Sequence, residues 1–411
     1  MRISTLQAFN NGVSGIQRNY ANATRTQEQI STGNRILTPA DDPVASVRLL
    51  QLEQQQSVLS QYDSNLTAAK NSLTQEEVTL NSVNTVLQRV RELAVQAGNG
   101  ALDPQDRKSI AAELGEREDE LLALMNTRNA RGEYLFSGFQ GKTQPFVRAA
   151  DGSYSYQGDE GQRKLQIASS LSIPISDNGK SVFQSVTNAG RLSMTPAASS
   201  ISAPAVRLSA PLVEDEVAFA ATDFPAAGFE VRFDPTDPKA YEVYEVGGAV
   251  ALQSGRLDED DTSSDKLVFR GMTIHIDGVP AGGETFTFQR TGQEKQGVLD
   301  TVANLRKALE DPATGNNGVR DAVGVALTNL DHGMVTVDAA RGNIGARLNI
   351  IETTQTDNQD VSLVNKGVQA ELRELDYAEA LSRLSLQTVV LEAAQQSYVK
   401  ISGLSLFNVM R

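Results

Sequence analysis

The residues that could do acid–base or metal chemistry are few in this chain. It has two histidines, His275 and His332, and no cysteine, which excludes disulfides, thiol catalysis and cysteine-ligated zinc. His275 lies in a stretch where apolar and polar residues alternate, and His332 lies beside Asp331 in a helical stretch. Neither has the spacing to a second histidine that a metal site uses. We therefore expect both histidines to be structural and the chain not to be an enzyme.

Carboxylates and glycines give no stronger signal of a site. The densest acidic run, DEDD at residues 258–261, lacks the spaced ligands and central glycine of a calcium loop, so an acidic loop is favoured over cation binding. Residues 132–141, GEYLFSGFQG, lack the patterns of phosphate-binding loops. We predict no cofactor and no metal. We expect four aromatic residues to form a small core under this loop: Tyr134, Phe136, Phe139 and Phe146.

The charge and hydropathy of the chain limit its partners. A net charge of −14 over 411 residues argues against nucleic acid, which requires a basic surface to neutralise phosphates. It argues equally against anionic lipid. No segment is apolar enough to cross a membrane, and residues 1–20 contain no apolar core of a signal peptide. We expect neither nucleic acid nor membrane as a partner, and a chain that is cytoplasmic or exported without a cleaved signal.

The elements at the N-terminus are helical. Residues 1–30 carry an apolar stripe at alternating spacings of four and three, which consists of Phe9, Val13, Ile16, Tyr20, Ala23, Gln27 and Ile30. Gly33 is a suitable end for this helix, and Asp42 before Pro43 is a suitable start for the next. A helix with so few charges would be marginal alone in water and requires a partner.

The strongest pattern is a heptad repeat in residues 44–97. Leucine recurs at every seventh position: Leu52, Leu59, Leu66, Leu73, Leu80 and Leu87. Polar residues interrupt the accompanying stripe at Gln55, Asp63, Lys70 and Glu76, so we favour one helix of a bundle over an isolated two-stranded coiled coil. A second helix, beginning at Pro104, would form an antiparallel helical hairpin with it.

The middle of the chain changes to strand patterns. Residues 153–156 and 164–167 alternate around QGDEGQ and predict a hairpin. Residues 190–293 are rich in alternating segments, with Ile274 and Ile276 followed by Phe286 and Phe288. The intervening DGVPAGGE predicts a hairpin loop between them.

Helical patterns return at residues 298–309, 323–351 and about 365–403. In the last of these, Tyr377, Leu381, Leu384, Leu391 and Tyr398 share one stripe. The chain stays apolar to its end, where termini are usually polar. The predicted fold class is therefore α+β, with long terminal helices in a coiled-coil rod or bundle, a small β-hairpin region and an inserted β-rich outer domain. The predicted divisions are 1–40 with 366–411, then 41–189 with 294–365, and 190–293.

Several segments resemble the flagellin-type axial proteins of bacterial flagella. Residues 30–46, ISTGNRILTPADDPVAS, resemble the segment that closes their first helix, and the terminal SGLSLFNVMR is similar to their C-terminal end. Residues 132–146, GEYLFSGFQGKTQPF, and 156–168, YQGDEGQRKLQIA, resemble the hook-associated members of this family that join hook to filament. The resemblance covers about residues 1–186 and 323–411.

This resemblance implies a flagellin-like fold and a structural role. The terminal helices would pair in the inner core of a hollow tube, and copies of the chain would form a ring between the first hook-associated protein and flagellin. It further implies an extracellular protein that leaves unfolded by the flagellar type III system with an export chaperone. The implied assembly interface consists of Phe9, Val13, Ile16, Tyr20, Leu384, Leu391, Tyr398, Leu404 and Leu406. Alternatives are a flagellin-like filament protein and, less favoured, an exported adhesin that works through residues 190–293.

Overall fold

The structure is a computed structural model that describes residues 5–196, 206–221, 223–258 and 264–409. It contains two compact units, residues 1–66 with 352–411 and residues 67–351. Two helices, residues 43–97 and 315–373, contribute residues to both units. The three-part division expected from the sequence stays a prediction.

The first unit is helical. Its elements are α1 (Thr5–Thr32), α7 (Tyr377–Val409), the beginning of α2 (Pro43–Ala97) and the end of α6 (Gly315–Arg373). α1 is terminated by Gly33, the residue after its end, whose φ of 71° is the left-handed conformation that glycine adopts without strain. The expected start signal of α2 is present, because Asp42 Oδ1 accepts the N–H of Ala45 at 3.0 Å.

The expected helix boundaries between residues 351 and 365 are wrong. α6 is continuous to Arg373, and the break falls at residues 374–376. Residues 352–364 contain neither glycine nor proline, so no residue forces the helix to end, and contacts with α2 support it. One of them is the hydrogen bond from Gln56 Nε2 to Ser362 Oγ at 2.7 Å. The sparse apolar pattern here therefore reflects a polar seam and not a loop.

The second unit contains a helical bundle of α2, α3 (Pro104–Met125), α5 (Val298–Glu310) and α6. Leu66, Leu73, Leu80 and Leu87 are fully buried, as the heptad repeat predicts for a helix packed on several neighbours. Ion pairs join the helices at the surface: Arg89 to Glu113 of α3 at 2.8 Å, and Arg91 to Asp331 of α6 at 2.8 Å.

Two hairpins lie between α3 and the β-rich region, but not the one expected. β1 (Phe146–Arg148) pairs with β2 (Tyr154–Tyr156), and β3 (Lys164–Gln166) pairs with β4 (Ser172–Pro174). The predicted pairing of 153–156 with 164–167 is therefore wrong. The intervening segment is held elsewhere, because Asp159 Oδ1 accepts the N–H groups of Phe139 and Gly161 at 2.9 and 2.7 Å.

The aromatic core under the GEYLFSGFQG loop forms without one of its expected members. Tyr134, Phe136 and Phe146 are buried, and the rings of Phe136 and Phe183 meet edge to face at 5.0 Å. Phe139 is 66% exposed, so its expected place in this core is wrong. Gly138, with φ of 70°, turns the chain back before Phe139 can enter the core.

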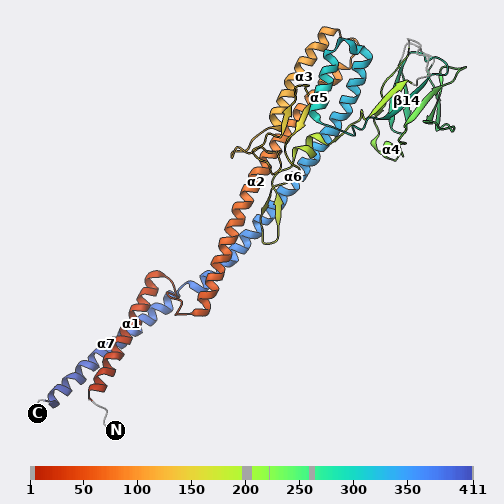
Figure 1. Ribbon diagram of the computed structural model, residues 1–411. Helices are drawn as coiled ribbons and strands as arrows, with labels where there is room; N and C mark the ends of the chain where they lie inside the picture. The colour runs from red at the N-terminus through yellow and green to blue at the C-terminus, as the bar shows by residue number, and fades with distance from the viewer. Residues whose placement is uncertain (1–4, 197–205, 222, 259–263, 410–411) are drawn as a thin grey trace. The chain divides into compact units, whose positions relative to one another are not determined.

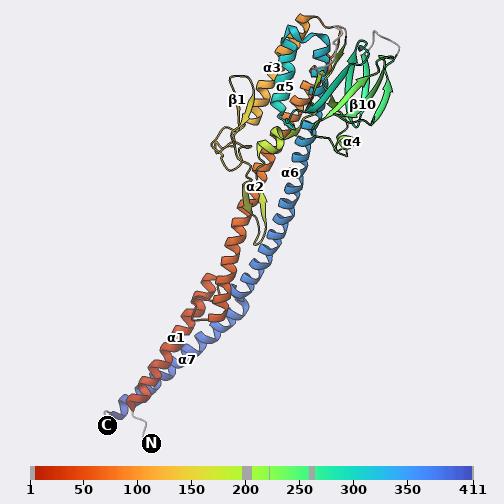
Figure 2. The ribbon, with the colours of Figure 1, turned by 45° about the vertical axis from the view of Figure 1, so that its right-hand side comes forward.

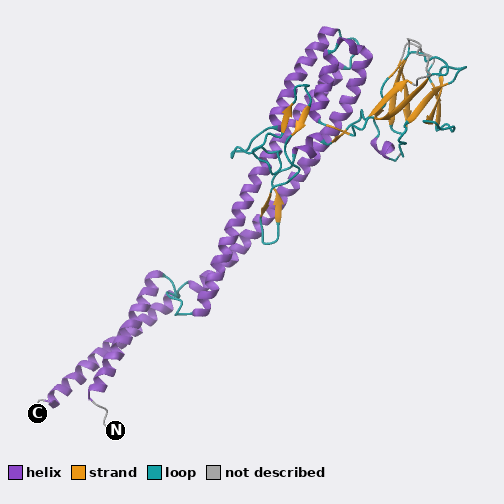
Figure 3. Cartoon of the chain, in the orientation of Figure 1, coloured by secondary structure: helices purple, strands orange, loops and turns teal. Residues whose placement is uncertain are grey.

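Residues 192–290 contain two sheets (Figure 3). The first has the order β11-β10-β9-β14-β6, and the second has the order β12-β13-β7, with β8 also paired to β13. Their bounds are β6 Leu192–Pro196, β7 Arg207–Leu208, β8 Leu212–Val213, β9 Phe229–Phe233, β10 Ala240–Glu245, β11 Gln253–Arg256, β12 Ser264–Phe269, β13 Met272–Asp277 and β14 Thr285–Arg290. A short helix, α4 (Glu216–Ala220), follows β8. The remaining elements of this unit are η1 (Lys180–Gln184), η2 (Pro312–Thr314), and β5 (Val186–Thr187) paired with β15 (Lys295–Gln296).

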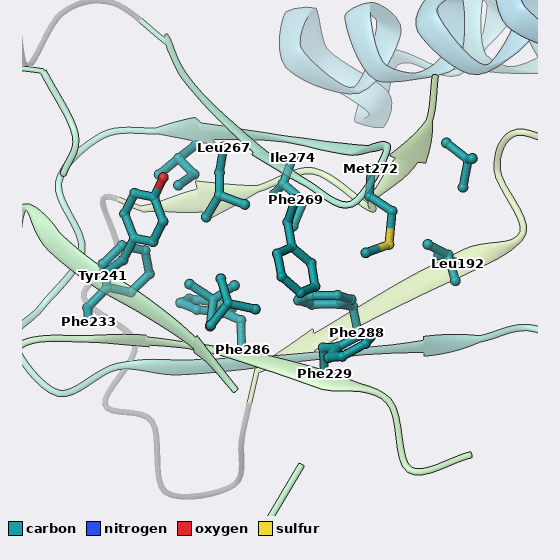
Figure 4. Packing of buried hydrophobic residues seen from close by; sticks show 14 of the residues in the cluster. Leu192, Phe229, Phe233, Tyr241, Leu267, Phe269, Met272, Ile274, Phe286 and Phe288 are labelled. Atoms are coloured by element: carbon teal, nitrogen blue, oxygen red, sulfur yellow. The ribbon is translucent and has the colours of Figure 1, made fainter. Parts of the chain in front are cut away.

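The two sheets enclose one apolar core, and this corrects a second hairpin. β13 and β14 belong to different sheets, so DGVPAGGE crosses between sheets and is not a hairpin loop. Ile274 and Ile276 from one sheet, and Phe286 and Phe288 from the other, share the same buried cluster (Figure 4). Alternation correctly indicated which side chains are buried, but it carries no information on which strand is the neighbour.

Polar contacts fix this sandwich to α6. Arg320 of α6 makes two bonds to the carboxylate of Asp277 in β13, at 2.8 and 3.1 Å. Asn329 Oδ1 accepts the N–H of Ala189 at 2.6 Å, just before the sandwich begins. Bidentate arginine–carboxylate pairs impose geometry as well as attraction.

Candidate assembly surface

α1 and α7 lie side by side in the first unit (Figures 1 and 2). Between residues 377 and 400, the described positions that are not fully exposed are Ala380, Leu384, Gln387, Leu391, Ala394 and Tyr398. Their spacing of four and three residues is the heptad pattern of one helix packed along another. On α1 the corresponding positions are Gly12, Ile16, Asn19, Ala23, Thr26 and Ile30.

The structure brings several of the expected interface residues to this contact. Val13 and Ile16 of α1 are half-buried, as are Leu384, Leu391 and Tyr398 of α7. Ile16, Leu384, Leu391 and Tyr398 occupy seam positions of the two contacting helices, and Val13 lies next to the seam position Gly12.

Other expected residues lie elsewhere. Tyr20 is 63% exposed, outside the contact of α1 with α7. Phe9, Leu404 and Leu406 lie on the two helices, but their side chains are outside the described part of the chain. Their roles in an interface with neighbouring copies stay predictions.

The seam also contains members that sequence reasoning missed. Gly12, Gln387 and Ala394 lie in it, although none is a large apolar residue. The four–three spacing of α7 was available from the sequence, but polar Gln387 interrupts the apolar stripe and hides it. Gly12 gave no sequence signal, because its importance depends on the ring of Tyr398 (a Cβ on Gly12 would lie 3.3 Å from Tyr398 Cδ2).

α7 has a second apolar surface that no described residue of the chain covers. Five large apolar side chains lie off the seam and are exposed by 45 to 69%: Leu381, Leu386, Val389, Val390 and Val399. A helix that is apolar on most sides is normally buried on most sides. This surface therefore has the character of a contact with further helices.

A polar cavity of about 570 Å³ lies between α1, residues 35–42 and α7. Arg25 pairs with Asp41, and Arg383 pairs with Glu379 at 2.5 Å. The charges that line this cavity neutralise one another, so the cavity offers no excess charge to a ligand and no free acid–base pair.

The residues first considered for chemistry have structural contacts. Burial lowers the pKa of His275, with a further contribution from Arg320, so this imidazole is held neutral. His332 Nδ1 lies 2.9 Å from the carbonyl oxygen of Thr187. The N–H of Asp258 donates to Asp265 Oδ1 at 2.9 Å, and residues 259–261 are outside the described residues.

The described residues contain neither a cluster of metal ligands nor a membrane-spanning helix. No group of three or more His, Asp or Glu side chains there could hold a metal ion. None of the described helices is long and apolar enough to span a bilayer.

Comparisons with known proteins agree with this arrangement. Residues 3–141 match the bacterial flagellin N-terminal helical region. Flagellar hook-associated protein 3 of Salmonella typhimurium is 25% identical over the full length of both chains, and that of Escherichia coli is 26% identical over the full length of both. A flagellin of Clostridium tyrobutyricum is 24% identical over 94% of this chain and 95% of its own.

Solved structures show the same fold. The flagellar junction protein FlgL of Legionella pneumophila is 25% identical, has a TM-score of 0.60, and is matched over 80% of this chain and 100% of its own. FlgL of Xanthomonas campestris is 22% identical with a TM-score of 0.61, over 78% of this chain and 99% of its own.

The chain therefore has the fold of flagellin-like proteins, and its N-terminal helical region matches that of bacterial flagellins. Two relatives that align with it over the whole sequence are named flagellar hook-associated protein 3. These relatives are structural proteins of the flagellum and are not known as enzymes.

Proposed function

We propose that this chain is a structural axial protein that forms the junction between the flagellar hook and the filament. The observation that carries the proposal is its full-length relationship to proteins named flagellar hook-associated protein 3. The paired terminal helices and the uncovered apolar surface of α7 are consistent with a protein that polymerises.

In this proposal copies of the chain assemble as a ring through α1 and α7. The first hook-associated protein lies on one side of the ring and flagellin on the other. The chain reaches this extracellular position through the flagellar type III system, with an export chaperone and without a cleaved signal. The apolar side chains exposed on α7 would be covered by neighbouring copies, which supplies the driving force for assembly.

A strain that lacks the chain provides the direct test. We expect bare hooks on its cells and flagellin lost to the medium. An intact filament in this strain would contradict the junction role. If the chain were instead a flagellin-like filament protein, the alternative, the strain would have hooks without filaments and would lose no flagellin to the medium.

The assembly surface has a separate test with a matched control. Leu386→Glu places a charge on the exposed apolar surface of α7, where Leu386 is 66% exposed, so we expect export without assembly. Gln396→Glu adds the same charge at an exposed polar position of the same helix and should assemble normally. Equal assembly of both variants would exclude this surface.

A further inference from the structure

The segment that follows α1 and the segment that follows α6 are hydrogen-bonded to each other. α1 ends at Thr32 and α6 ends at Arg373. The N–H of Arg35 donates to the carbonyl of Arg373 at 2.8 Å, and the N–H of Leu375 donates to the carbonyl of Gly33 at 3.0 Å. Asn34 and Glu374 lie opposite each other between these bonds as an antiparallel bridge.

Side chains reinforce this bridge from both strands. Arg35 Nη2 donates to the carbonyl of Leu372 at 3.0 Å, and Arg373 Nε donates to Asn34 Oδ1 at 3.1 Å. Gln29 Nε2, from the last turn of α1, donates to the carbonyl of Arg35 at 2.6 Å. The end of α1 is therefore tied to the end of α6, which three residues separate from the start of α7.

Two glycine–tyrosine contacts continue the same alignment along the helices. A Cβ on Gly33 would lie 2.9 Å from the hydroxyl oxygen of Tyr377, and one on Gly12 would lie 3.3 Å from Cδ2 of Tyr398. From Gly12 to Gly33, and from Tyr377 to Tyr398, the separation is 21 residues in both strands. This is three heptads, so the two contacts have the spacing of one antiparallel helix pair, with the Gly33–Tyr377 contact at its exposed end.

We propose that the Asn34–Glu374 bridge and the Gly12–Tyr398 contact together fix the register of α1 on α7, and so position the assembly surface. The inference rests on the proposed function, since positioning matters only if these helices assemble. Gly12, Gly33, Asn34 and Glu374 are positioning residues, because they act through the placement of the helices and not through contact with a neighbouring copy.

The physical reason is that heptad seams alone tolerate slippage. A shift of α7 by one heptad would again bring apolar residues together, because the seam positions repeat every seven residues. Such a shift would break the two backbone hydrogen bonds of the bridge. It would also bring the Tyr398 ring against a residue that has a side chain. The bridge and the Gly12–Tyr398 contact therefore select one register among several that the burial of apolar side chains alone would allow.

A cysteine pair tests the bridge in the assembled protein. Residues opposite each other between the two bonds of such a bridge have Cα atoms about 4.5 Å apart, within the range that a disulfide spans. The chain has no other cysteine. In flagella of a deletion strain that expresses Asn34→Cys with Glu374→Cys, mild oxidation should give an intramolecular cross-link. Asn34→Cys alone should give none.

Exchanging a small for a large side chain tests the Gly12–Tyr398 contact. Gly12→Leu should displace the Tyr398 ring and lower the number of filaments per cell by about tenfold, as overpacking a tight contact does. Gly15→Leu is the control, because a Cβ on Gly15 meets nothing within 4 Å. Adding Tyr398→Ala to Gly12→Leu should restore filaments, which a general loss of helix stability would not allow.

The outcomes separate the inference from the proposed function. If the chain is absent from flagella, the proposed function fails. If it is present but cross-links only between chains or not at all, the register is not fixed by the bridge. Equal effects of Gly12→Leu and Gly15→Leu, or no rescue by Tyr398→Ala, would overturn the role of the Gly12–Tyr398 contact.

Discussion

The carboxyl group of Glu76, on α2, accepts the backbone N–H of Asp177 at 2.9 Å in the interior of the second unit. Asp177 is in turn held by two bonds from Arg347 of α6, at 2.9 and 3.1 Å. Glu76 occupies a heptad position three residues after Leu73, where an apolar residue is expected. Its carboxylate instead satisfies a buried backbone donor, which would otherwise be left unpaired.

Glu76 makes the stability of the second unit depend on pH. Burial, and then the neighbouring Asp177, raise the pKa of Glu76 to about 8. The folded state thus binds this proton more tightly than the unfolded chain, so the stabilisation is complete below pH 4.5 and is lost as the pH rises through 8. Glu76→Gln keeps the acceptor without the charge, and should raise the midpoint of thermal unfolding at pH 9.

The measurement is the unfolding midpoint of the full chain between pH 5 and pH 9, followed by circular dichroism. The Glu76→Gln curve should be flatter than that of the wild type at the alkaline end. Glu77→Gln changes the adjacent, half-exposed residue and should follow the wild-type curve. Parallel curves for Glu76→Gln and the wild type would contradict a protonated Glu76 in the folded state.

Glu118 joins three elements of the same unit. This fully buried carboxylate, on α3, accepts Arg306 Nε of α5 at 2.8 Å and the hydroxyl of Tyr154 of β2 at 2.5 Å. Arg306→Ala would leave the buried carboxylate with Arg148, 3.3 Å away, as its remaining cation, and we expect a loss of about 3 kcal/mol. Urea unfolding measures it. Arg117→Ala, which breaks an exposed pair with Glu120, should cost less than about 1 kcal/mol.

The leucines of the α2 heptad differ from its exposed apolar residues. Leu80 is fully buried and Val78 is 62% exposed. Leu80→Ala should lower the free energy of unfolding by about 2–5 kcal/mol, because it removes buried contacts and leaves a cavity. Val78→Ala should change it by less than about 0.5 kcal/mol. Similar losses from both substitutions, measured by urea unfolding, would contradict the position of α2 in the bundle.

The β-rich region can be removed without separating the ends that it joins. β5 and β15 flank it and pair antiparallel, with Val186 opposite Gln296 and Thr187 opposite Lys295. Replacing residues 189–293 with a short turn should therefore leave the helical remainder folded and able to assemble. Electron microscopy of a complemented deletion strain checks this. If filaments are lost while the shortened chain is exported and helical, the β-rich region takes part in assembly. That result would also argue against the adhesin alternative, in which this region is not needed for assembly.

Local patterns in the sequence were enough for most of the helices. The heptad leucines placed α2 to within a residue, and Asp42–Pro43 marked its start, because periodicity and capping depend on neighbours a few residues apart. The end of α6 was missed because local patterns do not show contacts with distant residues. Its last turns are polar, and only contacts such as Gln56 with Ser362 explain why they remain helical.

What the sequence by itself determined is most of the side chains that face a core and most of the helical segments, since both follow from spacing along the chain. The tertiary structure alone decided the partners. It placed β13 and β14 in separate sheets, put Glu76 against Asp177, and set Tyr398 over Gly12. The physical reason is that apolar burial is non-directional and accepts many pairings, whereas hydrogen bonds and close packing between residues distant in the sequence are satisfied in only one of them.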